Sequence, residues 1–119
     1  MVQDLRQEQL RALSWEEFAG SLEEAFRRDG YAVERPRVAG ADLALTKSGR
    51  VTLVGCKRWK VARAGVEPLR ELHAAREARE AQLCIYVSAG EFTDTARAFA
   101  AEKNVRLLHG AELAALLPR

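Results

Sequence analysis

Residues 51–60, with the sequence VTLVGCKRWK, begin as an apolar strand and end in a basic cluster. The cluster consists of Lys57, Arg58, Trp59 and Lys60. A strand that carries a lysine at the end of an apolar run is costly to bury unless the ammonium group has a partner or a chemical role. This stretch therefore constrains both the fold and the function of the chain.

The chain has 119 residues, which predicts a single domain with one proper core. Its composition, 48% hydrophobic and 30% charged, is typical of a soluble globular protein. No apolar run approaches the roughly 18 residues of a membrane span, and no signal-peptide pattern opens the sequence. We expect a cytoplasmic protein, with a polar lead-in at residues 1–12 and the domain at residues 13–119.

The two cysteines, Cys56 and Cys84, each lie inside an apolar run. Neither has a second cysteine or a histidine nearby at the spacing of zinc ligands. We predict buried free thiols in a reducing compartment, and a disulfide is not implied.

Basic residues are concentrated in the middle of the chain. Residues 42–66 carry six lysines and arginines against one acid, Asp42. The flanks are balanced, with six basic against eight acidic residues in 1–41 and seven against eight in 67–119. A basic segment of this kind is expected of a surface that faces a polyanion, and a solvated charged face is the alternative interpretation.

Hydrophobic periodicity and capping signals predict an α/β fold. A Ser-x-x-Glu capping box at Ser14 opens the first firm helix, and Gly30 ends it. We expect a short helix at 3–11, helices at 14–29, 68–80, 93–103 and 111–117, and strands at 31–34, 41–46, 51–57, 83–87 and 105–108. A three-strand meander followed by strand–helix–strand crossovers predicts a mixed central sheet flanked by helices on both faces.

Asp42 and Lys57 are the strongest candidates for chemistry, because they fall on adjacent paired strands where the third strand ends. A carboxylate at that point can hold a divalent metal ion. A neighbouring ammonium group can activate water or neutralise the charge of a phosphate in transfer. The alternative is a cross-strand salt bridge between the two residues, which is weak when exposed.

Together these residues give the sequence a family resemblance. Residues 13–117 resemble the Mrr-type restriction endonuclease domain of the PD-(D/E)xK nuclease superfamily, a group with a restriction-endonuclease-like core. The matching segments, in order, are WEEFAGSLEEAFRRDGY, GADLAL, VGCKRWK, SAGEFTDTARAFA and NVRLLHGAEL.

The resemblance implies a bacterial nuclease whose substrate is DNA. Asp42 matches the metal-binding aspartate of the family, and Lys57 matches the lysine of its (E/Q)-x-K motif. The implied cofactor is Mg²⁺ or Mn²⁺, and the implied partners are DNA and a second copy of the chain. Some members carry this domain behind membrane helices, which implies a cytoplasmic domain that itself makes no membrane contact.

Two positions depart from the family pattern. Gly55 stands where the motif has Glu or Gln, and Ala19 stands where the first helix usually has an acid. Glu16 and Glu23 neighbour Ala19 on one helix face and are candidate substitute acids, while Glu17 is also the capping-box residue. A magnesium site with one carboxylate would be weak, because the ion requires near-octahedral oxygen ligation.

The basic cluster suggests nucleic-acid contacts. Arg58, Lys60 and Arg63 are candidates for phosphate binding. Trp59 is a candidate for stacking on a base or sugar, and a core or interface aromatic is the alternative.

Three functional hypotheses follow from the sequence. The first is a metal-dependent endodeoxyribonuclease that uses Asp42 and Lys57. The second is a catalytically inactive nuclease fold, a pseudoenzyme kept for DNA binding or protein association. The third is a pure protein-interaction module whose interface includes Trp59 and the last helix.

Overall fold

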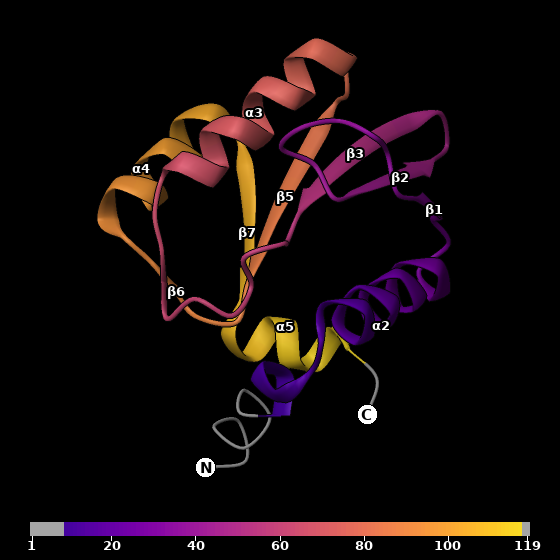
Figure 1. Ribbon diagram of the computed structural model, residues 1–119. Coiled ribbons are helices and arrows are strands. Elements are labelled where there is room, and N and C mark those ends of the chain that lie inside the picture. Colours follow the sequence, from indigo (N-terminus) through magenta and orange to yellow (C-terminus); the bar gives the residue numbers. More distant parts are fainter. Residues whose placement is uncertain (1–8, 118–119) are drawn as a thin grey trace.

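A computed structural model describes residues 9–117 as a five-stranded sheet between two layers of helices (Figure 1). The strands of this sheet are β1 (Ala32–Glu34), β2 (Leu43–Lys47), β3 (Arg50–Gly55), β5 (Leu83–Ser88) and β7 (Val105–His109). The helices are α2 (Trp15–Arg28), α3 (Glu67–Arg79), α4 (Asp94–Lys103) and α5 (Gly110–Leu116). A second, two-stranded sheet pairs β4 (Arg63–Ala64) with β6 (Glu91–Phe92).

The sheet is mixed, as the element order predicted. Its strand order is β1-β2-β3-β5-β7; β1, β2 and β3 are antiparallel, whereas β3, β5 and β7 are parallel. The β2–β3 hairpin turns through Ser48 and Gly49, both at positive φ (54° and 79°), as a two-residue type I′ loop requires. Helices α3 and α4 supply the two crossovers between the parallel strands.

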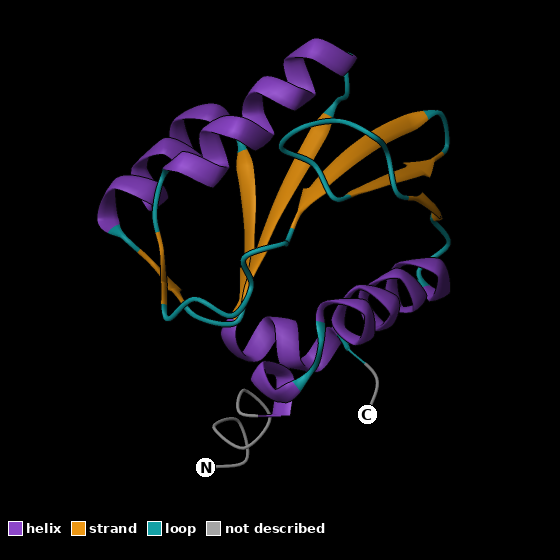
Figure 2. Cartoon of the chain, viewed as in Figure 1, coloured by secondary structure: helices purple, strands orange, loops and turns teal. Residues whose placement is uncertain are grey.

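The sheet splits the core into two apolar clusters. Helices α2 and α5 pack on one face, and α3 and α4 pack on the other (Figure 2). Strand β3 alternates as predicted, with Val54 in the first cluster and Leu53 in the second. Central strand β5 contributes side chains to both clusters, which confirms the interpretation of its continuous apolar run.

The predicted buried free thiols are confirmed, since Cys56 and Cys84 are both buried and unpaired. They belong to different apolar clusters, Cys56 to the first and Cys84 to the second. The sheet therefore separates the two thiols.

The predicted capping box at the start of α2 is present. The Ser14 hydroxyl accepts from the backbone N–H of Glu17, and the Glu17 carboxylate accepts from the backbone N–H of Ser14. Helix α2 ends at Arg28, and Gly30 follows at a φ of 96°. This cap fixes the helix that covers the first cluster.

The structure departs from the predicted elements at a few points. The β4–β6 sheet was not predicted, because strands of two residues are too short to show an alternating pattern. Its parallel register also pairs residues far apart in the sequence, Arg63 and Glu91. Helix α5 begins one residue earlier than predicted, at Gly110. The predicted helix at 3–11 lies largely outside the described residues, but residues 9–12 are helical and Leu10 is buried in the first cluster. Within residues 9–117, no helix has both the length and the apolar character needed to cross a membrane.

The loop between β1 and β2 passes very close to α3 at Gly40. Gly40 has a φ of 90°, and a Cβ atom there would lie 2.5 Å from the backbone oxygen of Glu71. Only glycine suits both this backbone conformation and this approach. The loop is thereby held next to the ends of β2 and β3.

We expect Gly40→Ala to lower the free energy of unfolding by about 3 kcal/mol, from backbone strain plus the clash with α3. Gly49→Ala is the matched control, because Gly49 also has a positive φ (79°) but has no atom within 4 Å of its Cβ position. Gly49→Ala should lower the free energy of unfolding by about 1 kcal/mol, from backbone strain alone. Urea unfolding of both variants measures the difference, and equal losses would contradict a close approach at Gly40.

Candidate functional site

Asp42 holds the backbone in place where β3 ends. The residue directly precedes β2, and its backbone N–H donates to the Val54 carbonyl (2.7 Å). Its carboxylate oxygen Oδ2 accepts from the backbone N–H groups of Cys56 (2.8 Å) and Lys57 (2.9 Å). These bonds fix the direction of the chain as it leaves the sheet, and they place Lys57 beside Asp42.

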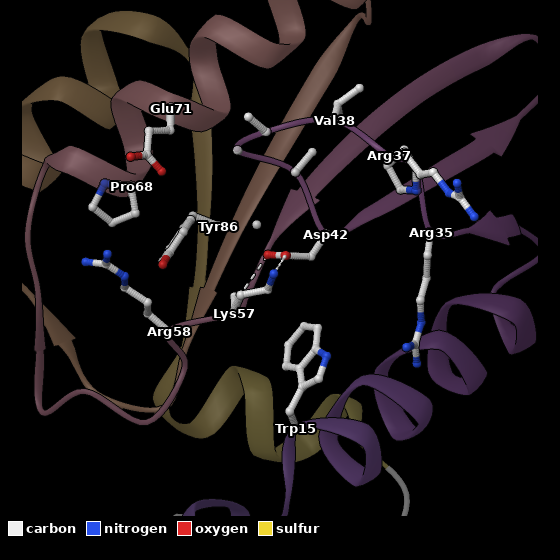
Figure 3. Close-up of a pocket in the computed structure, with 15 residues that line it drawn as sticks. Trp15, Arg35, Arg37, Val38, Asp42, Lys57, Arg58, Pro68, Glu71 and Tyr86 are labelled. Carbon is white, nitrogen blue, oxygen red and sulfur yellow. Dashed lines mark hydrogen bonds and ion pairs between the residues drawn. The ribbon is translucent and has the colours of Figure 1, made fainter.

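The structure brings the two predicted site residues together as an ion pair. Lys57 Nζ lies 3.8 Å from Asp42 Oδ1, with the lysine side chain 74% exposed and the aspartate 15% exposed (Figure 3). A pair at this distance with one partner in solvent contributes little to stability. The ammonium group is therefore available to an anionic ligand.

Asp42 and Lys57 open into a pocket of about 600 Å³ (Figure 3). The charged and aromatic residues that line it are Trp15, Arg35, Arg37, Asp42, Lys57, Arg58, Glu71 and Tyr86. Four of these residues are cationic and two are anionic. The lining side chains thus carry a net positive charge, although Arg35 is paired with Glu16 and Glu23 outside the pocket.

Tyr86 covers the position at which the family motif has a polar side chain. Gly55 and Tyr86 are partners in the parallel β3–β5 register. A Cβ atom on Gly55 would lie 3.0 Å from Cδ1 and 3.1 Å from Cε1 of the Tyr86 ring. Burial, together with the nearby charge of Asp42, raises the pKa of Tyr86 to about 12, so its phenol is protonated at neutral pH.

The three candidate substitute acids do not line the pocket. Glu17 is engaged in the capping box. Glu23 and Glu16 both bind Arg35, at 2.5 Å and 3.1 Å. These two acids therefore hold the Arg35 guanidinium at the edge of the pocket.

Ala19, the other departure from the motif, is fully buried in the packed face of α2. An acid reaches the pocket from another element instead. Glu71 lines it from α3, a position that the sequence reasoning missed. Glu71 lies near the pocket because the β1–β2 loop passes over α3 at Gly40. No local pattern in the sequence indicates this approach.

Trp59 belongs to the core, so the structure supports the core alternative for this residue. It is 4% exposed, and its ring stacks on Phe18 with centroids 4.4 Å apart. Its indole N–H lies 3.4 Å from the Leu10 carbonyl. The tryptophan at the pocket is Trp15, whose ring packs 5.8 Å from that of Trp59.

The three basic residues that were predicted to bind DNA lie at different places in the structure. Arg58 lines the pocket beside Lys57. Lys60 lies over the Trp59 ring, with Nζ 5.2 Å from its centroid. Arg63 lines a second pocket of about 630 Å³, together with Arg97 and His109 among others. The segment that carries these residues thus connects the two pockets.

The described residues do not form a magnesium site. Between residues 9 and 117, no three His, Cys, Asp or Glu side chains gather around one point. Oδ2 of Asp42 already accepts two backbone N–H groups, and Gly55 supplies no side chain. Cys56 is buried, and burial raises its thiol pKa well above the usual value, so it packs as a neutral thiol. Near-octahedral oxygen ligation is not provided by this donor set.

A family model described as Mrr_cat, restriction endonuclease, matches residues 10–117. The chain belongs to this family of restriction endonuclease domains. The family assignment predicted from the sequence is thus confirmed. No curated protein matches the sequence.

Solved structures share the fold at low sequence identity. A protein of unknown function, AF1548, superimposes with a TM-score of 0.62 at 12% identity, over 73% of this chain and 53% of its own. A repair endonuclease from Pyrococcus abyssi gives 0.59 at 16%, over 80% and 46%. The MspJI restriction endonuclease, in complex with a 27-mer oligonucleotide, gives 0.55 at 21%, over 86% and 27%. The predicted restriction-endonuclease-like core is confirmed, and the chain spans about half or less of each structure.

We expect Asp42→Ala to lower the free energy of unfolding by about 2 kcal/mol, because two backbone N–H groups lose their acceptor. Asp42→Asn keeps a side-chain oxygen for them and should cost less. Lys57→Ala is the matched control, with a loss below about 0.5 kcal/mol since its ion pair is exposed. Thermal and urea unfolding measure all three variants. Equal stability of Asp42→Ala and Lys57→Ala would show that the carboxylate has no structural role.

Proposed function

We propose that this restriction-endonuclease-like domain binds DNA through its phosphodiester backbone, with the pocket at Asp42 and Lys57 receiving a phosphate. The observation that supports this most directly is the exposed Lys57 ammonium, held at the mouth of a pocket that also presents Arg58. Cations on a fixed backbone are what phosphate binding requires. MspJI, which shares the fold, was crystallised with an oligonucleotide, and this agrees with the proposal.

Each residue has a defined part in this binding. Lys57 and Arg58 donate hydrogen bonds to phosphate oxygens. Asp42 orients Lys57 through the backbone N–H and through the weak ion pair. The Trp15 ring at the edge of the pocket offers an apolar surface to a sugar or base.

The second pocket extends the same surface. Arg63 and Arg97 line it, and Arg63 lies only six positions after Lys57 in the chain. A polyanion bound at the first pocket would continue along this basic segment, whereas a single small anion would not. Double-stranded DNA, with regularly spaced phosphates, is the polyanion that we propose for both pockets.

We expect Lys57→Ala and Arg58→Ala each to weaken DNA binding about ten-fold, through loss of a charge-assisted hydrogen bond. Each should also reduce the slope of log affinity against log salt by about one unit. The matched control is Arg50→Ala, which removes an exposed arginine at the opposite end of β3. Fluorescence anisotropy with a labelled duplex over a salt series measures both quantities. Equal losses in Arg50→Ala would point to diffuse charge, not to the pocket.

Metal-dependent hydrolysis of DNA is the second candidate function. It is favoured by the pairing of Asp42 with Lys57 and by the presence of Glu71 in the same pocket. The available metal ligands argue against it, because Oδ2 of Asp42 already accepts two backbone hydrogen bonds and Gly55 has no side chain to bind a metal ion. We therefore place binding ahead of cleavage.

We expect the purified chain to bind supercoiled plasmid without nicking it in Mg²⁺ or Mn²⁺, because the pocket lacks a full set of oxygen ligands. Agarose electrophoresis after long incubation measures nicking, with Lys57→Ala as the matched control. Nicking by the wild-type chain that disappears in Lys57→Ala would establish the hydrolase instead.

A pure protein-interaction module has less support. The large hydrophobic side chains exposed in the described part of the chain are Val61 and Leu83. Leu83 begins β5, whereas Val61 follows the opposite end of the neighbouring strand β3, so the two do not form one patch. A homodimer is compatible with the proposal but is not needed to complete the pocket, which one chain lines by itself.

A further inference from the structure

We propose that Tyr86 is a phosphate-binding residue of the pocket, and that its ring occupies the space beside Gly55. The inference rests on the proposed function, because it names a further ligand contact at the same site.

The sheet brings the Tyr86 ring against Gly55. Gly55 and Tyr86 face each other in the β3–β5 register, and the tyrosine ring would lie only 3.0 Å from a Cβ on Gly55. A contact of this length is tighter than most real Cβ contacts, so a side chain on Gly55 would require the ring to shift by a few tenths of an ångström. The small residue on β3 and the large one on β5 are therefore a coupled pair.

The Tyr86 hydroxyl has no hydrogen-bond partner among the described residues. Tyr86 is 3% exposed and lines the pocket, yet its hydroxyl forms no hydrogen bond with any residue of the described chain. Figure 3 shows its oxygen pointing toward Arg58. Among the described residues, no buried side-chain nitrogen or oxygen lacks a hydrogen-bond partner, so the unpartnered Tyr86 hydroxyl reaches the open space of the pocket. It is therefore free to donate a hydrogen bond to a ligand there.

The protonation state suits an anionic ligand. With a pKa of about 12, the phenol keeps its proton at neutral pH and can donate one hydrogen bond. Its neighbours in the pocket, Lys57 and Arg58, attract a negatively charged acceptor to the same place. A phosphate oxygen, from a diester or a terminal monoester, meets both conditions.

Tyr86→Phe tests the hydroxyl. We expect about ten-fold weaker binding of a fluorescein-labelled DNA duplex, with a melting temperature within about 2 °C of the wild type because no protein group loses a partner. Tyr31→Phe is the matched control, since Tyr31 packs on Phe26 and does not line the pocket. Blunt duplexes with and without a 5′-phosphate distinguish a terminal monoester from the internal diester.

A double-mutant cycle tests the space without any ligand. Gly55→Gln should lower the melting temperature by about 5 °C or more in the presence of Tyr86, and far less in a Tyr86→Ala background. Gly65→Gln is the matched control, because nothing lies within 4 Å of a Cβ on Gly65. If Gly55→Gln does not fold, Gly55→Ala supports the same cycle with a smaller shift.

The outcomes separate this inference from the proposed function. Equal DNA affinity of the wild type and Tyr86→Phe would overturn the role of the hydroxyl while leaving DNA binding intact. No binding by the wild type would overturn the proposed function and the hydroxyl's role with it. The same temperature shift for Gly55→Gln in both backgrounds would overturn the coupled pair, whatever the result with DNA.

Discussion

The pocket depends on one carboxylate oxygen that accepts two backbone hydrogen bonds. The N–H groups of Cys56 and Lys57 both donate to Oδ2 of Asp42 at the point where the chain leaves β3. An unsatisfied donor at this partly buried place would cost about as much as a lost hydrogen bond, so the aspartate is required for local folding. Its chemical role is thereby limited, because only Oδ1 is left, and that atom faces the Lys57 ammonium.

This use of Asp42 favours the binding of an anion that we propose for the pocket. Because the Lys57 backbone N–H donates to the Asp42 carboxylate, the lysine backbone is fixed while its ammonium group is exposed. Arg35, held by Glu16 and Glu23, adds a second fixed cation at the rim. Preorganised cations bind a phosphate at a lower entropic cost than mobile ones, which favours recognition even where hydrolysis is absent.

Local signals in the sequence predicted the elements, and distant pairings determined the site. The capping box of Ser14 and Glu17 and the alternation in β3 act over a few residues, so they could be recognised directly. Asp42 and Lys57 were predicted as neighbours because a tight hairpin fixes their register. The contact of Tyr86 with Gly55 depends on a parallel register across α3, which no local pattern specifies.

The two positions that depart from the family motif, Ala19 and Gly55, are both closely packed. Ala19 is fully buried in α2, so an acid there would place a charge in the core. Tyr86 on β5 packs closely against Gly55, so a side chain there would require the ring to shift. We therefore expect the double substitution Gly55→Gln and Ala19→Glu to destabilise the core and not, by itself, to form a metal site. A family resemblance in sequence does not by itself carry the activity.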